Sequence, residues 1–250
     1  MLSGNQIKYI NSLKLGKFRN IHQAFIAESP KLVNDLLDSI FIVRMIFATR
    51  QWLEINNEDP RLNKIDLFEI SEKELKKISS LKTPNQVLAV AGIPMYKFNI
   101  NILQKNLILV LDDIRDPGNM GTIIRTANWF GIRHIVCSRE SVDVYNPKVI
   151  QSTMGSIARV KIYYKDLAVF LQEVPDEIKV YGTVLHGRNI YKEKLAKYGI
   201  IIIGNESRGI SKELLPYITG HLSIPSWESK AESLNASVAA AIVISEFRRK

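Results

Sequence analysis

The last part of the chain is organised around Ile224-Pro225-Ser226-Trp227-Glu228-Ser229-Lys230-Ala231-Glu232-Ser233-Leu234-Asn235-Ala236-Ser237-Val238-Ala239-Ala240-Ala241. An apolar strand ends in this stretch, a polar loop follows, and an alanine-rich helix comes next. The serine and asparagine residues at the helix start are typical N-caps, because their side chains accept the unpaired amide protons of the first turn. Capping does not explain Ala236, Ala239 and Ala240, which leave one helix face almost without side-chain bulk. We therefore expect another backbone segment to approach this face closely.

Two earlier stretches have the same order of strand, loop and helix. One is Asp116-Pro117-Gly118-Asn119-Met120-Gly121-Thr122-Ile123-Ile124-Arg125-Thr126-Ala127, directly after the apolar run 107–111. The other is Gly204-Asn205-Glu206-Ser207-Arg208-Gly209-Ile210, directly after 200–203. Ligands of open parallel sheets bind beyond the carboxyl ends of the strands, so these loops are expected to converge. Neither stretch contains GxGxxG or GxxxxGKS/T, which leaves the dinucleotide and P-loop interpretations without support.

In this order, the three stretches resemble the three motifs of the SpoU/TrmH family, the RNA 2′-O-ribose methyltransferases of the SPOUT superfamily. The similarity covers residues 105–250. It implies an α/β fold whose C-terminal domain is a mostly parallel sheet with helices on both faces and a trefoil knot. The chain departs from the family pattern at Arg115, where glutamine is common, at Ser207, where glycine is usual, and in its longer loop 226–232.

The resemblance also implies S-adenosylmethionine as the cofactor and points to residues at matching positions. The catalytic site would be lined by Asn119, Arg125, Glu206, Ser233 and Asn235. The cofactor would lie against the loops after strands 179–185, 200–203 and 222–224, at Thr183, Leu185, Gly204, Asn205, Glu206, Ile224, Ser233 and Leu234. No metal is expected, because the histidines show no paired ligand spacing and Cys137 has no cysteine partner.

Methyl transfer to a ribose requires the 2′-oxygen to be held in line with the methyl carbon and to lose its proton. Arginine stays protonated in proteins, so we expect Arg125 to act while charged, polarising the hydroxyl or binding a neighbouring phosphate. Asn235 and Glu206 are expected to hold the geometry of the site, and Asn119 to orient Arg125. The structural alternatives are a solvated Arg125, N-cap roles for Asn119 and Asn235, and a surface-loop Glu206.

The first 95 residues alternate strands with helices, which predicts a smaller α/β domain. Strands are expected at 25–27, 41–47, 67–70 and 86–93, helices at 5–15, 29–37 and from 71, and a linker-like segment at 16–20. Residues 25–33 and 81–90 resemble the RNA substrate-binding domain often fused to these methyltransferases; the alternative is a merely stabilising appendage. The expected organisation is residues 1–95 for RNA binding, 96–105 as a linker and 106–250 for methyl transfer.

In the C-terminal domain, strands and helices again alternate. The pattern predicts strands at 107–112, 134–137, 159–164, 179–185 and 200–203, and helices at 119–130, 147–154, 166–172, 192–198 and from about 235. Such alternation is typical of a parallel sheet covered on both faces. The resemblance implies a homodimer through this domain, and the apolar side chains of helix 119–130 favour one as well: Ile123, Ile124, Trp129 and Phe130.

The net charge of +9 suits a polyanionic partner, because lysine and arginine that neutralise phosphates supply the sequence-independent part of nucleic-acid affinity. The expected RNA anchors of the N-terminal domain are Lys8, Lys14, Lys17, Arg19, Lys31 and Arg44. The sequence shows neither an N-terminal apolar segment typical of a signal peptide nor an apolar run of membrane-spanning length. We therefore expect no membrane association and a cytoplasmic location.

These patterns lead to one main hypothesis about function. The chain is expected to be an S-adenosylmethionine-dependent enzyme that methylates a ribose 2′-hydroxyl, with ribosomal RNA as the substrate and transfer RNA as the second choice. The alternative from a different class is a non-catalytic RNA-binding protein of the same fold. The presence of Arg125, Glu206, Ser233 and Asn235 argues against that alternative.

Overall fold

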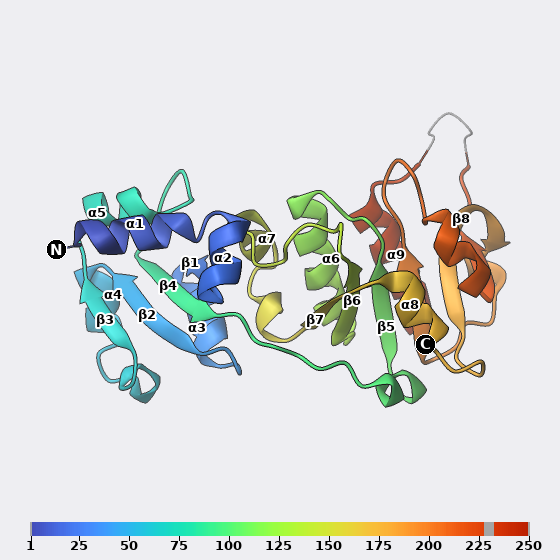
Figure 1. The fold of residues 1–250 in the computed structure, drawn as a ribbon, viewed down its shortest axis with the longest axis horizontal. Coiled ribbons are helices and arrows are strands. Elements are labelled where there is room, and N and C mark those ends of the chain that lie inside the picture. Colours follow the sequence, from blue (N-terminus) through green and yellow to red (C-terminus); the bar gives the residue numbers. More distant parts are fainter. Residues whose placement is uncertain (1, 228–232, 250) are drawn as a thin grey trace. The chain divides into compact units, whose positions relative to one another are not determined.

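The computed structural model describes residues 2–227 and 233–249, so part of the loop that precedes the last helix lies outside the described residues. The chain forms two compact units (Figure 1). The first consists of Met1–Met95 together with Asp143–Arg159, and the second of Tyr96–Val142 together with Val160–Lys250. The chain therefore passes between the units three times.

The first unit contains a four-stranded sheet in the order β1, β4, β2, β3. Strand β4 runs antiparallel to β1 and β2, and β2 runs parallel to β3. The strands are β1 (Ala24–Glu28), β2 (Val43–Ala48), β3 (Asp66–Glu69) and β4 (Val87–Gly92). The α-helices are α1 (Gly4–Ser12), α2 (Gly16–His22), α3 (Pro30–Leu37), α4 (Arg50–Ile55), α5 (Glu72–Ile78) and α7 (Pro147–Ser152).

The segment 16–20, expected as a linker, is instead part of helix α2. Arg19 on this helix is almost completely buried. Its Nη2 lies 2.6 Å from Asp143 Oδ2, and its Nη1 donates to the carbonyl of Leu13 over 2.9 Å. The partner carboxylate is 124 residues away in sequence, so no local pattern could reveal it. Arg19 is consequently unavailable as the RNA anchor that the sequence suggested.

Residues 143–159 lie between two strands of the C-terminal sheet in sequence, yet they complete the first unit. Besides the Arg19–Asp143 ion pair, Arg159 Nη2 lies 2.6 Å from Asp35 Oδ1. The rings of Tyr145 and Phe25 pack with their centroids 5.0 Å apart. Helix α7 and the turn η3 (Ser156–Ala158) supply further buried apolar side chains to this unit: Val149, Ile150 and Ile157.

The second unit is built on a six-stranded sheet in the order β10, β8, β9, β5, β6, β7, and every neighbouring pair is parallel. This confirms the predicted parallel α/β fold. The strands are β5 (Leu107–Leu111), β6 (His134–Ser138), β7 (Lys161–Lys165), β8 (Val180–Asn189), β9 (Gly199–Ile203) and β10 (Gly220–Ser223). The helices and short 3₁₀ turns are η2 (Ile100–Gln104), α6 (Pro117–Trp129), α8 (Leu167–Gln172), η4 (Ile190–Lys192), η5 (Lys212–Tyr217) and α9 (Ala236–Arg248).

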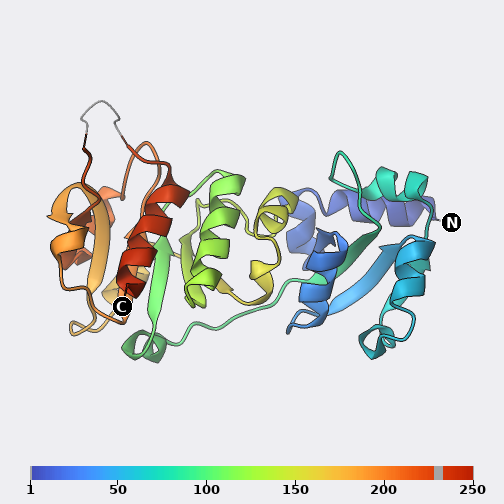
Figure 2. The same cartoon turned by 180° about the vertical axis from the view of Figure 1, so that it is seen from behind.

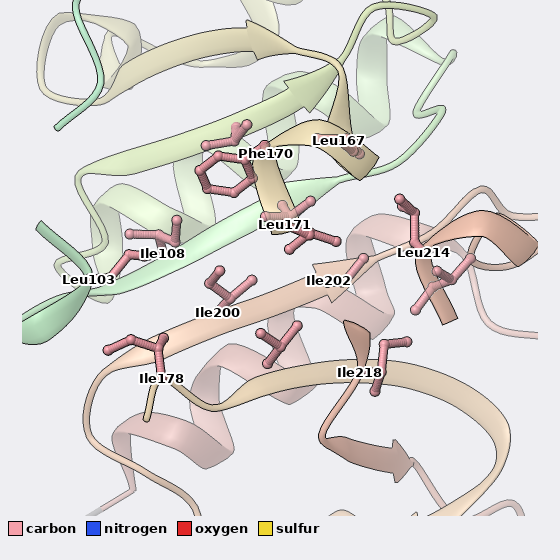
Figure 3. Close-up of a cluster of buried hydrophobic side chains, with 14 of the residues drawn as sticks. Leu103, Ile108, Leu167, Phe170, Leu171, Ile178, Ile200, Ile202, Leu214 and Ile218 are labelled. Carbon is pink, nitrogen blue, oxygen red and sulfur yellow. The ribbon is translucent and has the colours of Figure 1, made fainter. Parts of the chain in front are cut away.

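Helices cover both faces of this sheet, as expected. Figure 2 shows α9 beside α6 on one face, and Figure 1 shows α8 on the other. Figure 3 shows Phe170 and Leu171 of α8 in the same buried cluster as Ile200 and Ile202 of β9. Because side chains alternate across a strand, Ile201 points to the opposite face, where α9 packs against β9 and α6. The central strands are therefore buried on both sides, which explains their nearly unbroken apolar sequences.

Three expectations about the second unit need correction. Residues 96–105 are not a free linker, because Leu103 is fully buried and Tyr96 and Phe98 pack against the sheet core. The helix expected at 192–198 is only the short turn η4, and β8 is longer than expected because its end pairs with β10 after a register shift.

A further correction concerns the surface expected for a dimer. Ile123 and Ile124 are fully buried within the unit, since they lie on the face of α6 that packs inward. Trp129 at the end of the same helix is 84% exposed, and Val238 on the neighbouring α9 is also exposed. Of the four side chains expected at a dimer surface, Trp129 is therefore exposed and Phe130 is half-buried.

Candidate active site

The loops of the three motifs follow neighbouring parallel strands. Strands β8, β9 and β5 are adjacent, with β10 beside β8, so their carboxyl ends lie along one edge of the sheet. The first motif follows β5, the second follows β9, and the third follows β10. The expected convergence of the loops therefore follows from the observed strand order.

The loop after β9 is held in shape by its own backbone and by Asn205. The amide and carbonyl of Asn205 exchange hydrogen bonds of 3.0 and 2.9 Å with Gly209. A Cβ atom on Gly204 would lie 2.3 Å from the carbonyl carbon of Gly209, so this turn accepts no side chain there. Asn205 Oδ1 accepts from the amides of Ser207 and Arg208, and its Nδ2 donates to the carbonyl of Asp113 over 2.8 Å. Asn205 thus links the second motif to the loop after β5.

A chain of hydrogen bonds joins all three motifs through their side chains. Asn119 Nδ2 donates to Glu206 Oε1 over 2.6 Å, and Asn235 Nδ2 donates to Asn119 Oδ1 over 3.0 Å. Ser233 Oγ lies 3.4 Å from the carbonyl oxygen of Glu206. Four of the five expected catalytic residues are therefore in contact, although they come from three separate parts of the sequence.

The helix starts explain how these side chains are free to meet. The N-cap of α6 is Asp116, whose Oδ1 accepts from the amide of Asn119 over 2.8 Å. The N-cap alternative for Asn119 is therefore wrong. Asn235 is the N-cap of α9, because its Oδ1 accepts from the amides of Ser237 and Val238. Its Nδ2 remains free to donate to Asn119, so Asn235 combines the structural role with the contact between motifs.

Arg125 does not take part in this chain of hydrogen bonds. It lies six residues after Asn119 on α6, about 9 Å further along the helix axis at 1.5 Å per residue. Its side chain is exposed and makes no hydrogen bond or ion pair with another described residue. The expected orienting contact from Asn119 to Arg125 is not formed, because the Asn119 amide group is used by Glu206 and Asn235.

The expected cofactor-binding positions follow the carboxyl ends of β8, β9 and β10. Thr183 Oγ1 donates to the carbonyl of Ile202 over 3.1 Å and so ties β8 to β9. Leu185 and Leu234 are exposed large apolar side chains, and Ile224 is half-buried. Gly187 is as constrained as Gly204, since a Cβ atom there would lie 2.5 Å from the carbonyl carbon of Leu222. Exposed leucines beside tightly apposed backbone suit a ligand that needs apolar walls and amide hydrogen bonds.

One functional candidate was not found from the sequence. Asp113 has a φ of +55°, and its carboxylate contacts Arg115 from the first motif and Arg208 from the second. The hydrogen bond from Arg115 to Asp113 raises the pKa of that guanidinium. Three aspartates and one arginine at residues 112–116 were visible in the sequence, but neither the backbone conformation nor the contact with Arg208 could be read from them.

Neither a reactive thiol nor a metal cluster is indicated by the described residues. Burial raises the pKa of the Cys137 thiol, which disfavours the reactive thiolate form. Within residues 2–227 and 233–249, no group of three or more His, Cys, Asp or Glu residues could hold a metal ion. In the same ranges, no helix is both long and apolar enough to span a membrane. The connected amides and the Glu206 carboxylate are suited to positioning hydroxyl and amino groups of a ligand by hydrogen bonds.

Two family models match the chain, one in each part. Residues 106–245 match the model of the SpoU rRNA methylase family, and residues 4–89 match the MRM3-like substrate binding domain. The chain is 31% identical over 245 residues to the Bacillus subtilis 23S rRNA (guanosine(2553)-2′-O)-methyltransferase RlmP, covering 97% of this chain and 96% of that protein. The similarity therefore includes the N-terminal unit as well as the motifs.

Solved structures agree with these matches. An RNA methyltransferase of the TrmH family from Porphyromonas gingivalis is 39% identical, with a TM-score of 0.88 over 99% of this chain and 98% of that one. An AdoMet-bound rRNA methyltransferase from Sinorhizobium meliloti is 28% identical, with a TM-score of 0.89 over 99% and 95% of the two chains. The similarity to these two structures thus extends over both units.

Proposed function

Because the chain belongs to the SpoU rRNA methylase family, we propose that it transfers a methyl group from S-adenosylmethionine to a ribose 2′-hydroxyl of ribosomal RNA. The observation that carries this proposal is the contact of Asn119, Glu206 and Asn235, which unites the three motifs at the carboxyl edge of the sheet. The near full-length similarity to a 23S rRNA ribose methyltransferase supports the choice of substrate.

The residues present fit the cofactor. The tight turns at Gly204 and Gly187 bring backbone groups close together, and Leu185 and Leu234 offer exposed apolar surface. We assign the cofactor site to these loops, together with Thr183, Asn205, Glu206, Ile224 and Ser233. When bound, S-adenosylmethionine supplies a methyl group on a positively charged sulfur, and the ribose oxygen displaces that sulfur.

The remaining catalytic work falls to the residues of the chain. Asn119, Glu206, Ser233 and Asn235 hold the three loops in register, which fixes the distance between cofactor and ribose. Arg125 carries no internal partner among the described residues, so its guanidinium is available to bind a phosphate beside the target ribose. A charged guanidinium there stabilises the negative charge that develops on the 2′-oxygen, and the proton leaves to phosphate or water.

Three further assignments belong to the same proposal. The chain forms a homodimer through the exposed Trp129 and Val238 of α6 and α9, its C-terminal segment threads a trefoil knot, and it works in the cytoplasm, where the proposed substrate is found. Light scattering at micromolar concentration tests the dimer, with Trp129→Glu expected to yield monomers. Dimers that persist in this variant would place the interface elsewhere.

Mapping of ribose methylation in total cellular RNA, with and without this protein, tests the proposed function. We expect one 23S rRNA ribose to lose its methyl group when the protein is absent. Loss of ribose methylation in transfer RNA alone would make transfer RNA the proposed substrate. Calorimetry showing no S-adenosylmethionine binding would refute the enzyme assignment.

A further inference from the structure

We infer that Asp113 holds Arg115 and Arg208 as a paired clamp for a backbone phosphate of the substrate RNA. This inference rests on the proposed function and adds a substrate contact by residues that were not assigned to the catalytic or cofactor site above. The name "arginine clamp" is used below for these three residues.

The carboxylate of Asp113 contacts both arginines with different oxygens. Arg115 Nε lies 2.6 Å from Oδ1, and Arg208 Nη1 lies 3.9 Å from Oδ2. Within these three residues, one negative charge is shared by two positive charges, which leaves a surplus of one, and Glu140 also acts on Arg115 from outside the clamp. A phosphate group supplies the charge that would balance this surplus.

The two guanidinium groups are open to a ligand. The Arg115 side chain is 59% exposed and that of Arg208 is 74% exposed, whereas Asp113 is only 14% exposed. Each guanidinium has five N–H donors, and Asp113 occupies only a few of them. Planar guanidinium groups bind phosphate oxygens in pairs of hydrogen bonds, which favours a phosphate over a simple anion such as chloride.

Asp113 is fixed from both sides of its backbone. Its amide donates to Ser138 Oγ over 3.0 Å, and its carbonyl accepts from Asn205 Nδ2 over 2.8 Å. Its φ of +55° is in the left-handed region, where aspartate and asparagine are tolerated better than other side chains. A carboxylate held in this way can position the two arginines before RNA binds, which lowers the entropy cost of fixing them.

The clamp adjoins the proposed active site through a short chain of bonds. Asn205 bonds to Asp113, and its neighbour Glu206 accepts from Asn119. A phosphate bound by Arg115 and Arg208 would therefore lie close to the loops that hold the target ribose. The clamp would then fix the position of the RNA backbone at the active site, in addition to its contribution to affinity.

The first test removes the arginines. RNA affinity of the full-length protein is measured with a 23S rRNA fragment spanning guanosine 2553 and with unfractionated tRNA, at several salt concentrations. Arg115→Ala and Arg208→Ala should each weaken binding of the RNA that the wild type methylates about tenfold. Each should also reduce the slope of log affinity against log salt concentration by about one. Affinity for S-adenosylmethionine should not change. Arg249→Ala is the matched control, because Arg249 is equally exposed and paired with Glu246.

The second test separates positioning from net charge. Asp113→Asn keeps the shape and the tolerance for positive φ but removes the carboxylate. Glu246→Gln makes the same change in net charge and frees Arg249. Added positive charge should strengthen binding of every RNA in both variants. In Asp113→Asn alone, the methylation rate at saturating RNA should fall about tenfold, because the two arginines are no longer held in one arrangement.

The outcomes distinguish this inference from the proposed function. A wild-type protein that methylates no RNA would refute the proposed function, and the clamp with it. A methylating wild type whose Arg115→Ala/Arg208→Ala variant keeps the wild-type affinity and salt slope would refute the clamp alone. A wild-type methylation rate of Asp113→Asn at saturating RNA would likewise refute the positioning role of Asp113.

Discussion

Asn119 donates its side-chain amide to the carboxylate of Glu206 over 2.6 Å, joining helix α6 to the loop after β9 across 87 residues of sequence. The same amide group accepts from Asn235 through its oxygen. Because Asn119 serves both neighbours at once, its loss removes both bonds, whereas the loss of Glu206 or Asn235 removes one of them. The three residues should behave as one unit in mutational experiments.

Asn119→Ala and Glu206→Ala should each lower the methyl-transfer rate about a hundredfold, and the double variant should be little worse than either. The reason is that both substitutions break the same bond, which predicts a coupling energy of about 1–3 kcal/mol in a double-mutant cycle. Single-turnover kinetics with saturating RNA give the rates. Asn106→Ala, which removes only a hydrogen bond to Ile102, is the control. Additive effects would contradict the shared-unit interpretation.

Gly204→Ala should abolish S-adenosylmethionine binding while most of the fold is retained. The added Cβ atom would lie 2.3 Å from the Gly209 backbone, so the loop after β9 must open. Isothermal titration calorimetry measures the binding, and circular dichroism checks the fold. Gly4→Ala is a suitable control, because no atom lies within 4 Å of the added carbon. Retained binding in Gly204→Ala would show that this turn does not shape the cofactor site.

Arg125→Lys should lower the single-turnover methylation rate by about a hundredfold or more, with cofactor affinity almost unchanged. Lysine keeps the charge but lacks the planar, bidentate donor geometry of arginine. Arg125 is exposed and unpaired among the described residues, so the melting temperature should not change. Arg125→Ala should be slower still. A wild-type rate in Arg125→Lys would reduce Arg125 to a solvated helix residue.

Deletion of residues 1–95 should yield an aggregating protein, although the motifs remain. The deletion removes Arg19, Asp35 and Phe25, which are the partners of residues 143–159, and exposes the apolar side chains of that segment. A variant that also replaces residues 143–159 with a flexible linker should stay soluble, bind S-adenosylmethionine and lose most RNA affinity. Size-exclusion chromatography compares the two truncations. If both truncations are equally soluble, residues 143–159 do not need residues 1–95 to cover their apolar side chains.

His134 should make the fold less stable in mild acid. Burial lowers the pKa of His134, and the charges of Lys161 and Arg133 lower it further. The unfolded chain therefore takes up a proton near pH 6.5 before the folded chain does, so this stabilisation is complete above pH 6.5 and decreases as the pH falls. Urea unfolding at pH 7.5 and 5.5 should show a smaller loss of stability in His134→Gln than in the wild type.

The sequence by itself determined the features that depend on neighbouring residues. Continuous apolar runs such as 107–111 and 200–203 predicted buried parallel strands, because a strand covered on both faces has no polar side to display. The order of loop and helix after each run placed the three motifs at strand ends. Asn119, Glu206, Ser233 and Asn235 were selected from the resemblance of these motifs to the SpoU/TrmH family, and the structure brings them together.

Only the tertiary structure decided the features that depend on distant partners. The burial of Arg19 against Asp143, the transfer of residues 143–159 to the first unit, and the inward orientation of Ile123 all result from packing between separated segments. The contact of Asp113 with Arg208 also requires a left-handed backbone that aspartate adopts only when its surroundings hold it there. Local patterns specify strands, helices and caps, whereas the choice of partner for a charged side chain is made by the folded chain as a whole.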